Sequence, residues 1–129
     1  MASERGAPFQ YAVLRLVPRI ERGECVNVGV VLFARTRDFL DVRTALDPAR
    51  ARALDPGLDV GRVGERLTAL ERIGRGDPAA GPIARLPRHE RFHWLTAPAS
   101  TVLQPSPVHT GLCDDPAATL ETLLLRLVR

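Results

Sequence analysis

The sequence predicts an α+β fold: an antiparallel sheet of four to five strands with helices packed mainly on one face. Two observations point to it. The first 34 residues contain two segments that are apolar on a strand period, and later apolar residues recur every three or four positions, as in helices. The predicted order is three strands, two helices, two strands and a final helix. At 129 residues the chain suits one domain, which we place at residues 9–129 after a disordered tail at residues 1–8.

Three strands begin the predicted domain. Phe9–Val17 is apolar on both faces, which favours a central place in the sheet. Cys25–Ala34 is the second strand, and Asn27 and Gly29 lie on its odd-numbered face. Phe39–Leu46 follows a polar turn and is predicted to be a half-exposed third strand. The even-numbered face of the second strand is aliphatic and should meet the main core; it consists of Val26, Val28, Val30 and Leu32.

Two helices are predicted in the middle of the chain. Asp47 is followed by proline, a pattern typical of a helix start, and the short helix ends before Asp55. Asp59 caps a longer helix, which Gly74 and Gly76 should end. The longer helix has one apolar stripe, made of Val60, Val63, Leu67, Leu70 and Ile73.

The last part of the chain is less regular. Residues 77–87 are predicted to form a loop, Glu90–Ala97 a fourth strand and Thr101–Gln104 a short fifth strand. Pro105–Gly111 contains prolines, which cannot donate to a ladder, so we expect an extended segment at the rim or edge of the sheet. The final helix begins at Asp115. Its wide apolar stripe, which should dock on the sheet, consists of Leu120, Leu123, Leu124, Leu127 and Val128.

Composition argues against several classes of protein. All 18 basic residues are arginine, and Ala, Gly and Pro are abundant, which is typical of a bacterium with a GC-rich genome. The arginines are interleaved with 15 acidic residues and only 5% of residues are aromatic, so nucleic-acid binding is disfavoured. No apolar run reaches the ~18–20 residues of a membrane span, and no signal peptide is recognisable. We therefore expect a cytoplasmic protein that does not bind membranes.

The sequence predicts no metal and no cofactor. Cys25 and Cys113 have neither metal-binding spacing nor a CxxC arrangement, and reduced thiols are expected in the cytosol. The HxH and HExxH metal patterns, the Walker loop, GxGxxG and GxSxG are also absent from the sequence. With no recognisable catalytic residues, a non-catalytic protein is favoured over an enzyme.

Asn27 and Glu24 are candidate binding residues at the second strand. The Asn27 amide either orients a ligand or partner group, or satisfies backbone groups of the loop near Arg22, since buried polar groups are normally paired. Glu24 can serve as an acid or base, or pair with Arg22. Gly29 is compatible with a bulge, a side chain or a ligand, and close packing by a helix residue is the interpretation we favour.

Four further candidates lie later in the chain: His93, Gln104, Ser106 and His109. Ser106 and His109 share an extended polar segment, and loops held by a rigid scaffold often carry function. A structural hydrogen-bonding role at the rim is the alternative for His109. A nucleophile–base pair would need Ser106 or Cys113 close to a histidine, which the sequence does not establish.

Three segments of the chain together resemble a bacterial family catalogued as domain of unknown function 3037 (DUF3037). They are Phe9–Arg15, the strand pattern of Arg22–Phe33 and the segment Gln104–Gly111. The similarity extends from Phe9 to the final helix. An aromatic or other apolar residue commonly follows the Gly-Glu pair in the family; this chain has Cys25 there, which weakens any role for it as a shared nucleophile. The family has no established activity, so the resemblance implies no catalytic residues.

The resemblance also implies a kind of partner, because members of the family are often encoded beside kinase-like proteins of the HipA type. A non-catalytic accessory or protein-interaction module, with a HipA-type partner, is the function we favour. The alternative is a small-ligand-binding protein or enzyme with a pocket around Asn27, His93 and His109. Arginine-mediated phosphate or nucleic-acid binding is a weaker third hypothesis. The sequence leaves the oligomeric state open.

Overall fold

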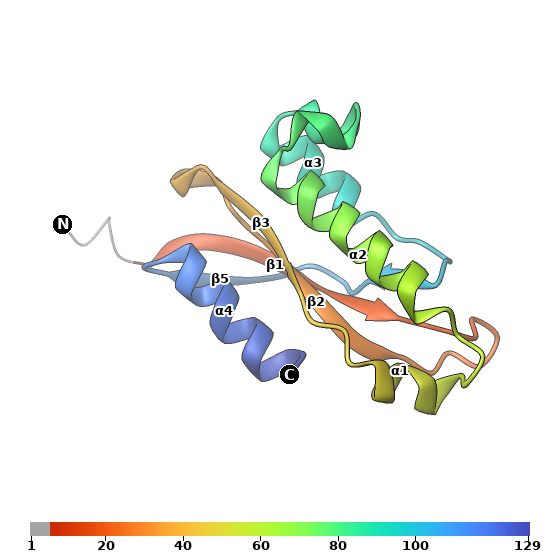
Figure 1. The fold of residues 1–129 in the computed structure, drawn as a ribbon. Coiled ribbons are helices and arrows are strands. Elements are labelled where there is room, and N and C mark those ends of the chain that lie inside the picture. The colour runs from red at the N-terminus through yellow and green to blue at the C-terminus, as the bar shows by residue number, and fades with distance from the viewer. Residues whose placement is uncertain (1–5) are drawn as a thin grey trace.

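The computed structural model describes residues 6–129 and arranges them around an antiparallel sheet of five strands (Figure 1). β1 and β2 are central, β3 pairs with β2 at one edge, and β4 and β5 pair in turn with β1 at the other edge. The predicted α+β class is therefore confirmed. The strands are β1 (Ala7–Leu16), β2 (Val26–Ala34), β3 (Phe39–Thr44), β4 (Leu103–Pro105) and β5 (His109–Cys113).

Aspartate side chains start three of the helices, as predicted. Asp47, Asp59 and Asp115 each accept a hydrogen bond from backbone N–H groups of the first turn that follows, which satisfies donors without a partner inside the helix. The longest helix ends at Gly76, whose φ of 72° is the left-handed conformation that glycine adopts without strain. The helices are α1 (Pro48–Leu54), α2 (Val60–Arg75), α3 (Arg88–Leu95) and α4 (Pro116–Leu127). No helix within residues 6–129 combines the length and apolar character needed to cross a bilayer.

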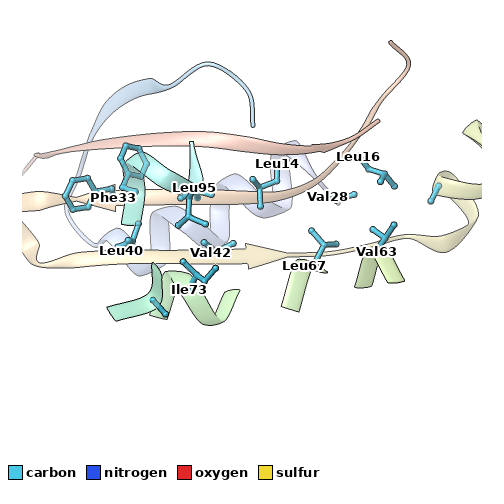
Figure 2. Packing of buried hydrophobic residues seen from close by; sticks show 14 residues of the cluster. Leu14, Leu16, Val28, Phe33, Leu40, Val42, Val63, Leu67, Ile73 and Leu95 are labelled. Carbon is cyan, nitrogen blue, oxygen red and sulfur yellow. The ribbon is translucent and has the colours of Figure 1, made fainter. Parts of the chain in front are cut away.

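The sheet is buried on both faces. Helices α1, α2 and α3 supply the main core on one face, and α4 packs on the opposite face, as Figure 1 shows for α2, α3 and α4. Most helices thus lie on one face, as predicted. Figure 2 shows the main core, whose labelled members are Leu14, Leu16, Val28, Phe33, Leu40, Val42, Val63, Leu67, Ile73 and Leu95. The smaller α4 core contains Phe9, Val30, Leu32, Ala34, Cys113, Leu120, Leu124 and Val128.

A β-bulge in β2 divides that strand between the two cores. Leu14 pairs with Gly29 and the next residue, Arg15, pairs with Asn27, so Val28 is the extra residue. Val28 packs in the main core, whereas Val30 packs in the α4 core. The prediction that the even-numbered face of this strand is continuous is therefore wrong, because the bulge reverses the alternation of side chains.

Gly29 is explained by the neighbouring strands. A Cβ atom at this position would lie 3.0 Å from the carbonyl oxygen of Arg43 in β3 and 3.2 Å from Leu14 Cδ1 in β1. The expected close packing by a helix residue is thus wrong. The bulge brings the strand backbones so close that only glycine fits without displacing a neighbour.

The segment predicted as a fourth strand, Glu90–Ala97, is instead mainly helix α3. The helix follows Pro87 and turns Phe92 and Leu95, three residues apart, into the main core. The rings of Phe92 and Phe33 have centroids 5.1 Å apart. Because the contact partner lies on β2, far away in the sequence, it leaves no signal within the segment itself. The apolar residues of so short a segment fit a helix or a strand equally well.

Three other predicted boundaries shift. The expected rim or edge segment Pro105–Gly111 overlaps the edge strand β5, because pairing with β1 resumes at His109 after the prolines, displaced by one residue relative to β4. Gly74 lies inside α2 and does not end it. At the N-terminus, residues 1–5 of the expected tail lie outside the described residues, and β1 already begins at Ala7.

Candidate functional site

Asn27 and Glu24 have structural partners. Asn27 Nδ2 donates a 2.9 Å hydrogen bond to the backbone oxygen of Leu127, at the end of α4. This bond satisfies one of the carbonyl groups that a helix leaves free at its C-terminus. Glu24 pairs with Arg22 across 2.7 Å, and both side chains are solvent-exposed. Asn27 therefore attaches α4 to β2, in place of the predicted bond to the loop near Arg22.

Ser106 and Gln104 also bond to nearby backbone. Ser106 is 3% exposed, and its Oγ accepts a 2.8 Å hydrogen bond from the Val13 N–H and donates a 2.9 Å bond to the Pro107 oxygen. Gln104 Nε2 donates to the Thr101 oxygen at 2.8 Å. The Ser106 hydroxyl thus takes the place of a backbone partner where prolines interrupt the pairing of β4 with β1.

The two candidate histidines lie on opposite faces of the sheet. His109 in β5 pairs with Tyr11, and their ring centroids are 5.3 Å apart. Tyr11 packs against the α4 core, so His109 belongs to that face. His93 is in α3, on the face of the main core. Asn27, His93 and His109 therefore do not converge on one pocket.

His93 instead lines a different cavity, with a volume of about 370 Å³, which we call the histidine cavity. His89 and His93 are four residues apart and contribute to it from one face of α3. Arg35, directly after β2, lies on the same cavity. The full lining is Gln10, Phe33, Arg35, His89, Phe92, His93, Thr96 and Val108.

A second hollow of about 410 Å³ lies between α2, the end of α3 and the segment leading into β4. Its wall is mostly apolar and includes Trp94, which is 45% exposed. Arg66 is the charged residue of the lining. Both hollows fall in the size range of ligand pockets.

Burial shifts the pKa values of titratable groups outside these hollows, among them Arg91 and Cys113. Arg91 of α3 is buried, and burial lowers the pKa of its guanidinium. Its Nη1 donates to the Leu86 oxygen at 2.6 Å and its Nη2 contacts the Gly74 oxygen at 3.5 Å, so it links α3 to the C-terminal turns of α2. Burial also raises the pKa of the Cys113 thiol. Cys25 is exposed, and both cysteines are free.

The two edges of the sheet differ in what covers them. At the β3 edge, the Val42 N–H donates to Asp41 Oδ1 at 2.9 Å and the Thr44 N–H donates to Glu71 Oε2 at 3.1 Å. Glu71 belongs to α2, which packs along this strand. Side chains therefore bond to two backbone donors of the β3 edge and α2 packs along it, a common protection against unwanted strand pairing.

The β5 edge has no such cover among residues 6–129. The Ser106 N–H donates to the Val13 oxygen at 2.8 Å, so odd-numbered residues of β1 turn their backbone groups toward this side. By the alternation of antiparallel pairing, their partners His109 and Gly111 point inward, and Thr110 and Leu112 point outward. The Leu112 side chain is 72% exposed.

Comparison with known families identifies the chain. The family described as "Protein of unknown function (DUF3037)" matches residues 11–128, nearly the whole sequence. The chain belongs to the DUF3037 family. No curated protein and no solved structure matches it. The resemblance expected from three sequence segments is thus confirmed, and the membership of this DUF3037 protein supplies no reaction.

Sequence reasoning missed His89, Arg35 and Gln10 as site residues. The predicted strand Glu90–Ala97 began after His89, so the helical face that His89 and His93 share was not recognised. Gln10 lies in β1 and Arg35 directly after β2, so only the fold brings them together at this cavity. Within residues 6–129, no group of three or more His, Cys, Asp or Glu side chains is arranged to hold a metal ion.

Proposed function

We propose that this DUF3037 protein is a non-catalytic interaction module that binds an extended segment of a partner protein along the edge of β5. The contrast between the two sheet edges carries the proposal: in β3 the outward N–H groups of Val42 and Thr44 bond to side chains, and within residues 6–129 no such bond is made to the outward N–H groups of β5. An exposed edge is a template for an added strand, because backbone hydrogen bonds form whatever the partner's sequence.

Side chains at this edge support binding of an apolar strand. Leu112 is 72% exposed and Val108, just before β5, is 39% exposed. A partner strand added at this edge would point alternate side chains to the two faces of the sheet. An apolar side chain on the face of Leu112 can then pack against Leu112. A HipA-type kinase-like protein, the partner implied by the family resemblance, is the partner we propose to test.

The experiment is co-purification of this protein with a co-expressed HipA-type protein, followed by titration of the purified pair. Leu112→Lys places a charge at the edge, and Thr110→Pro removes an outward N–H while leaving the inward groups of the ladder in place. Each lost backbone hydrogen bond is expected to cost about 0.5–1.5 kcal/mol of binding free energy. Both variants should therefore weaken the complex.

Leu125→Lys is the matched control, since Leu125 is 64% exposed but lies on α4. It should leave binding unchanged, and circular dichroism should show that all variants are folded. The proposal fails if both edge variants bind as tightly as the natural protein. It also fails if the protein binds no HipA-type partner and turns over a substrate unaided.

A further inference from the structure

We propose that the histidine cavity binds a small organic phosphate monoester, with the phosphate held by Arg35, His89 and His93 and the organic group against Phe33 and Phe92. This ligand site lies on α3 and the ends of neighbouring strands, and it shares only Val108 with the β5 edge proposed above. The inference starts from the polarity of the lining, which has cationic and donor groups at its rim and an aromatic floor.

The polar groups of the cavity are available to a ligand. Arg35, His89, His93 and Gln10 are all exposed, and none makes a hydrogen bond or ion pair through its side chain with another of the described residues. Arginine offers planar paired donors that match a phosphate, and imidazoles add N–H donors. The spacing of the two histidines on α3 directs both to the same ligand.

The sign of the charge selects an anion. No Asp or Glu occurs among the residues that line the cavity, so a metal ion or an ammonium group would meet no carboxylate there. An oxyanion would meet the guanidinium of Arg35 and the N–H donors of two imidazoles. Exposed arginines are common in this chain, so Arg35 alone is weak evidence for a phosphate site. The stronger evidence is that Arg35 lines the same cavity as two histidines.

The floor of the cavity selects an organic ester over the free ion. Phe33 and Phe92 are 6% and 5% exposed, with ring centroids 5.1 Å apart, and Val108 closes the side. The volume of about 370 Å³ is larger than one phosphate needs and lies in the range of small-molecule sites. A planar apolar group can therefore occupy the space that the phosphate leaves.

The cavity also joins the three segments that carry the family pattern. Gln10 comes from the first, Phe33 from the second and Val108 from the third, and all three line this one hollow. The fold thus assembles the cavity from parts of the chain that are separated by more than 20 residues in each case.

The test is isothermal titration of the full chain with phenyl phosphate, inorganic phosphate, phenol and a short phosphoserine peptide. Phenyl phosphate should bind with a dissociation constant of about 1 mM or below, as ordinary ligand efficiency gives for a molecule of this size. Inorganic phosphate and phenol should each bind more weakly, because each fills half of the site. Absence of phenyl phosphate binding, or tighter binding of the phosphopeptide, would overturn the proposal.

Variants test whether phenyl phosphate binds in this cavity or is attracted by the overall positive charge of the protein. Arg35→Gln and His93→Gln should each weaken phenyl phosphate binding about tenfold or more, the effect of losing a hydrogen bond to the charged phosphate. Val108→Trp fills the cavity with all donors retained and should abolish binding. Arg88→Gln removes a neighbouring arginine that does not line the cavity and should leave binding unchanged. An equal loss in Arg88→Gln, or no loss in Arg35→Gln, would refute the assignment.

Discussion

Gly74 offers the sharpest test of how α2 packs on the sheet. It lies inside the helix, and a Cβ atom there would stand 2.7 Å from Val42 Cγ2 and 3.1 Å from the Val42 backbone nitrogen. Val42 is 1% exposed in β3, so it has no free space into which to move. Gly64, in the same helix, has nothing within 4 Å of the corresponding position.

The two glycines should respond in opposite directions to alanine. Alanine is favoured over glycine inside a helix by about 1 kcal/mol, so Gly64→Ala should raise the free energy of unfolding by up to that amount. Gly74→Ala gains the same preference but forces a methyl group into a filled core, which costs about 1–3 kcal/mol. The expected net effect at Gly74 is a loss of up to about 2 kcal/mol.

Urea unfolding followed by circular dichroism measures both changes. A third measurement places Gly74→Ala in a Val42→Ala background, where the side-chain clash is removed; the cost at Gly74 should then fall, as a double-mutant cycle detects. The reasoning is refuted if Gly74→Ala stabilises the protein as much as Gly64→Ala does. It is also refuted if the cost at Gly74 is the same with and without the Val42 side chain.

Three further predictions concern titration and tethering. Cys25 is exposed, whereas Cys113 is buried and burial raises the pKa of its thiol. A thiol reagent should therefore label Cys25 rapidly in the folded protein and Cys113 only when the protein unfolds. Rapid labelling of both cysteines would contradict the burial of Cys113. Burial raises the pKa of the Asp41 carboxyl in the folded protein. The protonated carboxyl therefore stabilises the fold at pH values below the unfolded pKa of about 3.9, and this stabilisation is lost as the pH rises through the raised pKa of the folded state. Asp41→Asn should therefore be more stable than the natural protein at neutral pH and lose this advantage near about pH 3, as urea unfolding at both pH values would show. Asn27→Ala removes the bond to the Leu127 oxygen and should lower the free energy of unfolding by about 1 kcal/mol, with faster hydrogen exchange in the last turn of α4; unchanged exchange would contradict the tether.

Local sequence patterns are enough to predict an element where its stability depends on neighbouring residues. Asp47, Asp59 and Asp115 mark helix starts correctly, because a cap depends on the backbone donors of the turn that follows. Local patterns failed at Glu90–Ala97, where the helix is stabilised by the contact of Phe92 with Phe33 on a distant strand. They failed also at Gly74, whose partner Val42 lies in β3.

The candidate site shows the same division. Asn27 was recognised from the sequence as an amide that needs a partner, but its partner, Leu127, is 100 residues away. His93 was recognised without Arg35 and Gln10, which reach the cavity from the ends of β2 and β1. Ser106 was a candidate for binding, and the structure gives its hydroxyl to the backbone of Val13.

The class of fold and most element boundaries follow from the sequence, because strand alternation, helical stripes and caps are properties of neighbouring residues, and the family follows from three short segments. Which residues meet depends on the tertiary structure. The bulge at Val28 distributes one apolar strand between two cores. The same long-range pairing leaves one sheet edge covered and the other open, and it gathers the donors of the histidine cavity. Such arrangements depend on contacts between segments far apart in the chain, which no local pattern contains.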